Sequence, residues 1–220
     1  MTQSISQKSQ TAAARDSEQT VFVVDDEAAV RDSLRWLLES IRLRVETFDS
    51  AEAFLQTVRA ERSGCIVLDV RMPGLSGPEL MDRLGRLGVA LPIIFLSAHG
   101  DVPLAVRAMK AGAFDFMQKP YNHQQFLERV QQALKHDAKN RNERQRHDHL
   151  ATTLARLTTR ERQILDRVVG GMSNKLIARE LNLSHKTVEA HRSRLMHKMG
   201  VGSFAELLQL VLTQGDPKPH

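Results

Sequence analysis

Four short apolar runs give the first 120 residues of this chain their pattern. They read VFVV, CIVL, LPIIFL and FDFM, and segments with apolar residues at helical spacing separate them. Strands that alternate with helices in this way are typical of βαβ units around a parallel sheet. We therefore expect an α/β domain over this part of the chain.

The segments between the runs carry helix signals. The first has one apolar stripe, made of Val30, Leu34, Leu37, Leu38 and Ile41. Two later segments begin with a capping pattern, in which Ser76 precedes Glu79 and Asp49 precedes Glu52. Each pattern predicts the start of a helix.

Polar residues stand at or just beyond the ends of the apolar runs. They are Asp25, Asp26, Asp69, Ser97 and Lys119. Because the carboxyl ends of parallel strands line one crevice, we expect these side chains to converge. The carboxylates suit Mg²⁺, Asp69 can act as a nucleophile, and Lys119 can pair with phosphoryl oxygens. Taken singly, each residue also fits a helix cap, a turn or the surface, but their joint order favours a phosphoryl site.

Basic charge is concentrated in the last third of the chain. The net charge is +5, to which residues 21–134 contribute −2 and residues 135–220 contribute +7. This predicts a nucleic-acid partner for the C-terminal part, with a solvated basic surface as the alternative. The single cysteine, Cys65, excludes an internal disulfide framework. The apolar runs are too short to cross a bilayer, so we expect a cytoplasmic protein without a membrane partner.

Changes in composition divide the chain into four parts. Residues 1–20 are rich in Ser, Gln, Thr and Ala and predict a disordered tail. Residues 136–152 are almost wholly polar and contain no Pro or Gly, which indicates a charged helical linker that can continue the preceding helix. The remaining ranges, 21–135 and 153–214, are the two predicted domains.

The second domain reads as all helical. Thr158 and Glu161 form a capping box for its first helix. A short helix over Asn174–Leu181 is followed at once by Ser184, the predicted N-cap of a longer helix that ends near Met199. Two helices joined so closely predict a helix-turn-helix.

The longer helix has two different sides. One side is apolar and consists of Val188, Leu195 and Met199. The other side is polar or small and consists of Lys186, Glu189, Ala190, Ser193 and His197. In a basic domain this fits a helix inserted into the major groove of DNA, with an ordinary surface helix as the alternative.

The first domain resembles a known family. VFVVDDE, IVLDVRMPGLSG, IIFLSAHGD and FDFMQKP closely resemble the motifs of two-component response-regulator receiver domains, in the expected order. The resemblance implies a flavodoxin-like fold, a doubly wound five-stranded parallel sheet. It also implies that Asp69 accepts a phosphoryl group from a sensor histidine kinase. Asp25, Asp26, Asp69 and the backbone carbonyl of Arg71 would hold Mg²⁺ or Mn²⁺.

The same resemblance assigns a switch. Ser97 and Phe116 would be the switch pair, and Lys119 the phosphate-binding lysine. Family members more often have Thr where Ser97 stands, which keeps the hydroxyl but can change the strength of switching. Phosphorylation would draw Ser97 towards the new oxygens and let Phe116 turn inward, altering the face formed by residues 101–110, 114–117 and 122–134.

The second domain resembles the LuxR-type helix-turn-helix. The residues that carry this are LTTRERQIL, GMSNKLIARELNLSHKTVEAHRSRLMHKMGV and FAELLQLV. Together with a receiver, this unit is typical of the NarL/FixJ subfamily of transcription regulators. The resemblance implies DNA contacts from Lys186, Thr187, Glu189, Ala190, His191, Arg192, Ser193, Arg194 and Lys198. Glu189, Ala190 and Ser193 match base-facing positions.

The last helix of the second domain carries an apolar stripe. Its apolar residues recur at helical spacing and would join two copies on a palindromic site; they are Phe204, Leu207, Leu208 and Val211.

We expect a phosphorylation-dependent, DNA-binding transcription regulator that forms a homodimer, binds promoter DNA and contacts RNA polymerase. The alternative is a signalling relay whose helical domain binds protein. An enzyme is least favoured, because the chemistry expected at Asp69, Mg²⁺-dependent self-phosphorylation and dephosphorylation, acts only on the chain itself.

Overall fold

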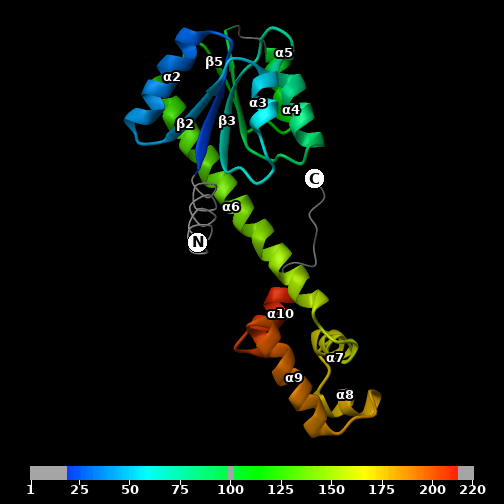
Figure 1. The fold of residues 1–220 in the computed structure, drawn as a ribbon. Coiled ribbons are helices and arrows are strands. Elements are labelled where there is room, and N and C mark those ends of the chain that lie inside the picture. Colours follow the sequence, from blue (N-terminus) through cyan, green and yellow to red (C-terminus); the bar gives the residue numbers. More distant parts are fainter. Residues whose placement is uncertain (1–18, 99–101, 213–220) are drawn as a thin grey trace, which may run out of the picture. The chain divides into compact units, whose positions relative to one another are not determined.

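The computed structural model describes residues 19–98 and 102–212 (Figure 1). Most of the predicted disordered tail therefore lies outside the described residues, as do Asp101 and residues 213–214. The chain divides into two compact units, Met1–Arg141 and Asn142–His220, which are described separately. Within the described ranges, no helix has the length and apolar character needed to span a membrane.

Five parallel strands form the sheet of the first unit. They are β1 (Thr20–Val24), β2 (Arg44–Phe48), β3 (Gly64–Asp69), β4 (Ile93–Ser97) and β5 (Asp115–Gln118). Their order in the sheet is β2-β1-β3-β4-β5, which confirms the predicted doubly wound topology. The apolar runs did not reveal β2, because this edge strand has the mixed sequence RVETF and four of its five residues are only half-buried.

Helices cover both faces of this sheet (Figure 1). They are α2 (Ala28–Ser40), α3 (Ala51–Thr57), α4 (Gly77–Arg86), α5 (Val102–Lys110) and α6 (His123–Ala155). Val21 and Val23 of β1 belong to the core formed with α2 and α6, whereas Phe22 and Val24 belong to the core formed with α3, α4 and α5. Since β1, β3 and β4 are buried on both faces, their sequences are continuously apolar.

The helix caps agree with the sequence in one case and differ in another. The capping box of Ser76 and Glu79 begins α4, with the Ser76 backbone N–H donating to Glu79 Oε2 at 2.9 Å. The expected Asp49 cap of α3 was wrong, because Ser50 is the N-cap and accepts from the Ala53 backbone N–H at 3.3 Å. Asp and Ser are similarly good N-caps, so the sequence did not distinguish two neighbouring candidates.

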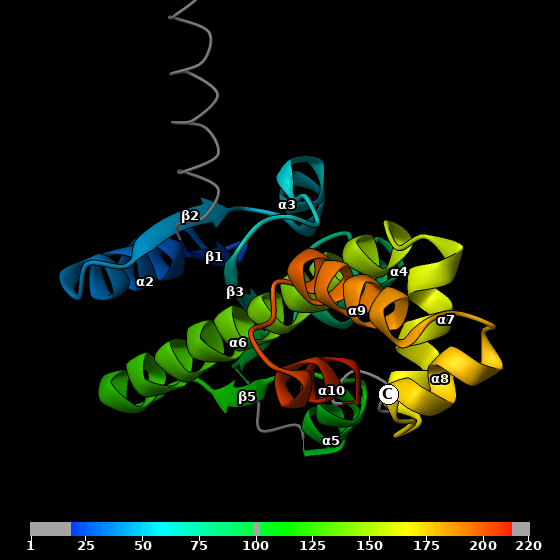
Figure 2. The ribbon, with the colours of Figure 1, turned by 90° about the horizontal axis from the view of Figure 1, so that it is seen from below.

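The second unit is helical throughout its described residues. After the end of α6 come α7 (Thr159–Val169), α8 (Asn174–Glu180), α9 (His185–Met199) and α10 (Phe204–Leu212), as Figure 2 shows. The capping box of Thr158 and Glu161 is present, and Ser184 caps α9 by accepting from the Thr187 backbone N–H at 3.0 Å. The predicted all-helical domain is therefore confirmed.

A tight link joins α8 to α9. Asn182 has a left-handed backbone with φ of 53°, a conformation that Asn tolerates better than most residues. Leu181 and Leu183 on either side pack on the core of the unit, which includes Ile177 and Val188. The link thus fixes how the two helices of the helix-turn-helix meet.

Candidate functional site

The predicted polar residues gather at the carboxyl edge of the sheet. Asp25 follows β1, Asp69 ends β3, Ser97 ends β4 and Lys119 follows β5. The Lys119 backbone N–H donates to the Ser97 carbonyl at 2.7 Å, which holds the two strand ends together. We call Asp25, Asp26, Asp69, Ser97 and Lys119 the acidic pocket.

Lys119 connects two carboxylates of this pocket. Its Nζ lies 2.8 Å from Asp25 Oδ2 and 2.8 Å from Asp69 Oδ1. Burial by itself lowers the pKa of Lys119, but the hydrogen bonds to Asp25 and Asp69 outweigh burial and raise the pKa above its ordinary value. The ammonium therefore stays charged and offsets the negative charge of both carboxylates.

The two aspartates after β1 have different surroundings. Asp25 is only 1% exposed, and its Oδ1 accepts from the Glu27 backbone N–H at 2.9 Å, whereas Asp26 is exposed. Arg31 on α2 donates to the backbone carbonyls of Asp25 and Asp26 at 2.8 and 2.9 Å. The sequence reading missed Arg31, although its position in the helix after the Asp pair is the signal that could have found it.

Asp69 is oriented by its own loop. It is 8% exposed, and its Oδ2 accepts from the Arg71 backbone N–H at 2.7 Å. Glu52 on α3 steadies the same loop, because its Oε1 accepts from the Leu75 backbone N–H at 3.1 Å. Glu52 was expected to cap α3, and its role beside the phosphoacceptor candidate was missed.

The donor chemistry of the pocket suits a hard divalent cation. The three carboxylates of the pocket offer the oxygen ligands that Mg²⁺ binds, and the Arg71 carbonyl predicted as a further ligand belongs to the residue whose N–H donates to Asp69. In the described ranges, however, no three His, Cys, Asp or Glu side chains form a group that could hold a metal ion. Lys119 instead pairs with Asp25 and Asp69. The residue types fit a metal, while the arrangement seen is that of a lysine-bridged carboxylate pair.

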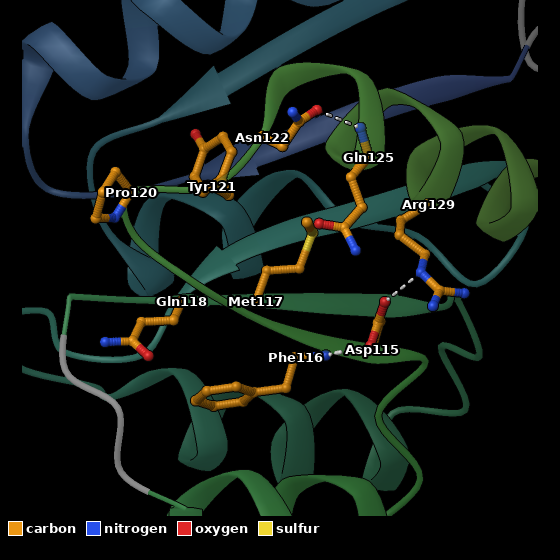
Figure 3. A pocket seen from close by; sticks show the side chains of 9 residues that line it. All are labelled: Asp115, Phe116, Met117, Gln118, Pro120, Tyr121, Asn122, Gln125 and Arg129. Carbon is orange, nitrogen blue, oxygen red and sulfur yellow. Dashed lines mark hydrogen bonds and ion pairs between the residues drawn. The ribbon is translucent and has the colours of Figure 1, made fainter.

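The predicted switch residues lie on adjacent strands. Ser97 is buried at the end of β4, and Phe116 on β5 is half-buried. The Phe116 ring lies 6.4 Å from the ring of Phe95, measured between centroids. Figure 3 shows Phe116 on the opposite side of β5 from Met117. The ring is thus only partly covered by the receiver core.

A polar surface pocket of about 330 Å³ lies beside β5 (Figure 3). Arg129 reaches from α6 to Asp115, with 3.0 Å between Nε and Oδ2. The other carboxylate oxygen of Asp115 accepts from the Phe116 backbone N–H at 2.8 Å. No aspartate of the acidic pocket lines this hollow, so it is separate from the proposed phosphoryl chemistry.

Helix α9 presents the two sides that the sequence indicated. Val188, Leu195 and Met199 are buried in the core of the unit. The exposed residues of the other side are Lys186, Glu189, Ala190, Ser193, Arg194 and His197. Most of the predicted DNA-contacting side chains are therefore free of the core.

Three residues of the predicted DNA set, Thr187, His191 and Arg192, are half-buried. Thr187 is half-buried and lies 2.7 Å from the Ser184 hydroxyl, measured between side-chain oxygens. Arg192 donates to the Asn174 side chain on α8. His191 is half-buried, and its Nδ1 has no hydrogen-bond partner among the described residues.

Lys198 forms an ion pair that the sequence did not predict. Its Nζ lies 2.7 Å from Oε2 of Glu161, the capping-box residue of α7. The hydrogen bond from Lys198, followed by the bonds from Thr158, lowers the pKa of Glu161 to about 2. The lysine thus joins the end of α9 to the start of α7, and the phosphate contact predicted for it stays a prediction.

One of the predicted dimer residues of α10 is buried in its own unit. Leu207 is 1% exposed and belongs to the core of that unit, and its dimer contact stays a prediction. Leu208 is half-buried and stays a prediction. The side chains of Phe204 and Val211 lie outside the described residues.

Two family models match this chain. The first, the response regulator receiver domain, matches residues 21–131. The second, bacterial regulatory proteins of the luxR family, matches residues 155–211. The two matches lie one in each of the two predicted domains.

Known proteins match nearly the whole length. The transcriptional regulatory protein TdiR of Thauera aromatica is 52% identical over 196 residues, covering 88% of this chain and 85% of TdiR. FixJ of Bradyrhizobium diazoefficiens is 42% identical over 195 residues, covering 89% of this chain and 95% of FixJ. This chain belongs to the NarL/FixJ family of response regulators. The solved structure of the response regulator StyR aligns with a TM-score of 0.83 and 46% identity, covering 90% of this chain and all of StyR.

Membership in the NarL/FixJ family settles the general role. The chain is a transcription regulator with a receiver domain and a LuxR-type DNA-binding domain. The receiver domain implies a sensor kinase as partner, and the helix-turn-helix implies binding to DNA. Its relatives are regulators, which favours a non-enzymatic role.

Proposed function

We propose that Asp69 accepts a phosphoryl group from a sensor histidine kinase and that this controls promoter binding. The observation that carries the proposal is the placement of Asp69 at the end of β3, with Lys119 Nζ 2.8 Å from one oxygen and the Arg71 N–H 2.7 Å from the other. A carboxylate held in this way is oriented for attack and has a cation beside it. Family membership in the response regulators supports the same assignment.

The transfer step is a displacement at phosphorus. An Asp69 carboxylate oxygen forms a bond to phosphorus while the bond from phosphorus to the donor histidine nitrogen breaks. The histidine keeps that electron pair and takes up a proton. Lys119 offsets the charge that develops on the phosphoryl oxygens. A small phosphodonor such as acetyl phosphate would react in the same way.

Mg²⁺ or Mn²⁺ is the cofactor that we propose for this step. Asp25, Asp26, Asp69 and the backbone carbonyl of Arg71 are the residues that would hold it, and their hard oxygen donors support this choice. When bound, the ion would reduce the repulsion between the carboxylates and the incoming phosphoryl group. The chain would also lose the phosphoryl group by self-catalysed hydrolysis.

Ser97 and Phe116 are the proposed route from the phosphoryl group to the surface. A phosphoryl group adds roughly −1.5 to −2 charge, which the Ser97 hydroxyl can approach as a hydrogen-bond donor. Phe116 is only half-buried against Phe95, which supports a ring that can turn inward. The surface that would change includes α5, where Val106 and Met109 are exposed.

Helix α9 is the proposed reading helix for double-stranded promoter DNA. Glu189, Ala190 and Ser193 are exposed and would face bases, while Lys186 and Arg194 would bind phosphates. Homodimer formation after phosphorylation and contact with RNA polymerase remain part of the proposal. The site of action would be the cytoplasm, where promoter DNA lies.

Substitution of the phosphoacceptor tests this proposal. Asp69→Asn keeps the shape of the side chain but removes the nucleophilic carboxylate, so labelling by radioactive acetyl phosphate should disappear. Asp82→Asn, at an exposed aspartate of α4, is the matched control and should label like the wild type. Phosphate labile to alkali and hydroxylamine that persists in Asp69→Asn would contradict the assignment.

A further inference from the structure

A carboxylate of the linker helix is buried in the receiver domain. Asp137 lies on α6, in the polar stretch that the sequence marked as a linker, yet it is only 3% exposed. Its Oδ2 accepts from the Ser63 hydroxyl at 2.7 Å and from the Gly64 backbone N–H at 2.9 Å. We call these three residues the linker anchor.

The burial of Asp137 makes its two hydrogen bonds important. Among the described residues, no ion pair involves Asp137, so a neutral hydroxyl and a backbone N–H compensate its burial. A buried carboxylate that loses its donors is strongly unfavourable. The helix therefore cannot move away from β3 at this point without either opening to water or leaving a polar group without a partner.

The loop that receives Asp137 is shaped by a glycine. Gly64 has φ of +141°, and a Cβ at this position would come within 1.7 Å of the Thr20 carbonyl oxygen. The Thr20 backbone N–H donates to the Ser63 carbonyl at 2.9 Å. The two donors that bind Asp137 are thus fixed to β1 as well as to β3.

Further contacts hold the same stretch of α6. The side chain of Gln19 donates from Nε2 to the Leu134 carbonyl at 2.6 Å, and Arg141 donates to the Glu61 carbonyl. The ring of His136 lies 5.5 Å from the ring of Phe114. Residues 134–141 are consequently part of the receiver domain, although their composition is that of a solvated linker.

The linker anchor and the acidic pocket lie at opposite ends of β3. Helix α6 packs on the sheet through Phe126 and Val130 in its first turns and is fastened again by Asp137 at the start of β3. The acidic pocket lies at the carboxyl ends of the same strands. The helix is thus held at both ends of the sheet and then continues without a break to Ala155.

We infer that Asp137 is a positioning residue that couples the receiver domain to the linker helix. This inference rests on the function proposed above. A structural change in the receiver domain moves α6 only along the part of the helix that is fastened to the sheet. Without Asp137, the contacts of His136 and Arg141 would remain, but the residues beyond Leu134 would follow the receiver less closely. Phosphorylation would then still occur but would alter DNA binding much less.

Four variants of the full-length protein test the anchor. Asp137→Ala removes the acceptor, and Ser63→Ala removes one donor. Asp137→Asn keeps an oxygen that can accept both bonds. Asp148→Ala, at an exposed carboxylate farther along α6, is the matched control.

The first measurement is amide hydrogen exchange of residues 136–141 in the unphosphorylated protein. Loss of hydrogen bonds to a buried carboxylate should speed exchange by about tenfold or more in Asp137→Ala. The increase should be smaller in Ser63→Ala and absent in Asp148→Ala. Unchanged exchange in Asp137→Ala would overturn the inference, whatever the role of Asp69. If that variant fails to fold, Ser63→Ala decides instead, and unchanged exchange in Ser63→Ala would likewise overturn the inference.

The second measurement is the gain in DNA affinity on treatment with acetyl phosphate and Mg²⁺. The DNA fragments are those selected by the treated wild type. Asp137→Ala should be labelled at the wild-type rate but lose most of the gain, while Asp137→Asn and Asp148→Ala keep it. A full gain in Asp137→Ala would overturn the coupling role. Absence of any gain in the wild type would instead count against the proposed function, and the exchange measurement would still decide on the anchor.

Discussion

Replacement of Lys198 by Met should destabilise the DNA-binding domain without removing a phosphate contact. Lys198 Nζ lies 2.7 Å from Glu161 Oε2, and the two side chains are 38% and 4% exposed. Glu161 also accepts from the Thr158 backbone N–H at 2.9 Å. Because Met keeps most of the apolar stem of Lys, the substitution removes mainly the charge.

The pKa of Glu161 sets the size of the effect. The hydrogen bond from Lys198 is the largest cause that lowers this pKa from 4.5 to about 2, and the bonds from Thr158 come next. At about 1.36 kcal/mol per pKa unit, the whole difference corresponds to about 3 kcal/mol. Since Lys198 is partly exposed and Thr158 shares the carboxylate, we expect Lys198→Met to lower the free energy of unfolding by about 1–2 kcal/mol.

The stability lost in Lys198→Met should decrease as the pH falls. A carboxyl with a lowered pKa in the folded state contributes stability above its unfolded pKa of 4.5, and this contribution is lost as the pH falls towards about 2. The difference between wild type and Lys198→Met should therefore be full at neutral pH and narrow below pH 4.5. A difference that stays constant over this range would refute the reasoning.

Urea unfolding followed by far-UV circular dichroism measures this difference. Trp36 and Tyr121, the one tryptophan and the one tyrosine of the chain, belong to the receiver domain. Because Trp36 is 81% exposed, its fluorescence reports unfolding poorly, and amide hydrogen exchange of the buried strands β1 and β3 follows that domain instead. Equal exchange of these strands in wild type and variant is the internal control.

The salt dependence of DNA binding tests the role of Lys198 independently. Each lost phosphate contact reduces the slope of log K against log salt by about 0.9. Arg194→Met, at an exposed cation of the same helix, should show this reduction, whereas Lys198→Met should show little. Equal reductions in both variants would mean that Lys198 binds phosphate after all.

Three further predictions concern other contacts. Arg192→Ala should weaken binding to all DNA sequences alike and lower the salt slope, as binding titrations at several salt concentrations would show; an unchanged slope would leave the contact with Asn174 as its role. Gly64→Ala should destabilise the receiver by several kcal/mol in urea unfolding, because its Cβ would overlap the Thr20 carbonyl; wild-type stability would contradict the φ of this residue. Glu52→Ala should speed hydrogen exchange at Leu75 and slow labelling of Asp69 by acetyl phosphate, while unchanged exchange would show that Glu52 does not hold the loop.

The sequence predicted the strands and the acidic pocket well for one physical reason. Strands buried on both faces are continuously apolar, so the polar residue that ends each run marks the edge of the sheet. Asp69 and Ser97 were found in this way, and the structure places them at the ends of β3 and β4. The edge strand β2 lacks this contrast, because its residues are mostly half-buried, and no apolar run revealed it.

Contacts between distant residues explain the remaining differences. Lys198 and Glu161 are 37 positions apart, and Asp137 and Ser63 are 74 apart. Local patterns predicted a DNA contact for Lys198, a helix cap for Glu161 and a linker position for Asp137. They did not indicate that these side chains are paired or buried, because charged residues are usually exposed. Only the packing of α7 against α9, and of α6 against β3, shows that these charged side chains pair or accept hydrogen bonds within the protein.

The contact at Asp115 has a consequence for how copies of this protein can associate. β5 is an edge strand, and such strands can serve as templates for another strand. The Asp115 carboxylate already accepts a hydrogen bond from the backbone N–H of Phe116 and forms an ion pair with Arg129. Extension of the sheet across this edge would have to break both interactions. We therefore expect copies that meet on this side to associate through side chains rather than by pairing of their edge strands.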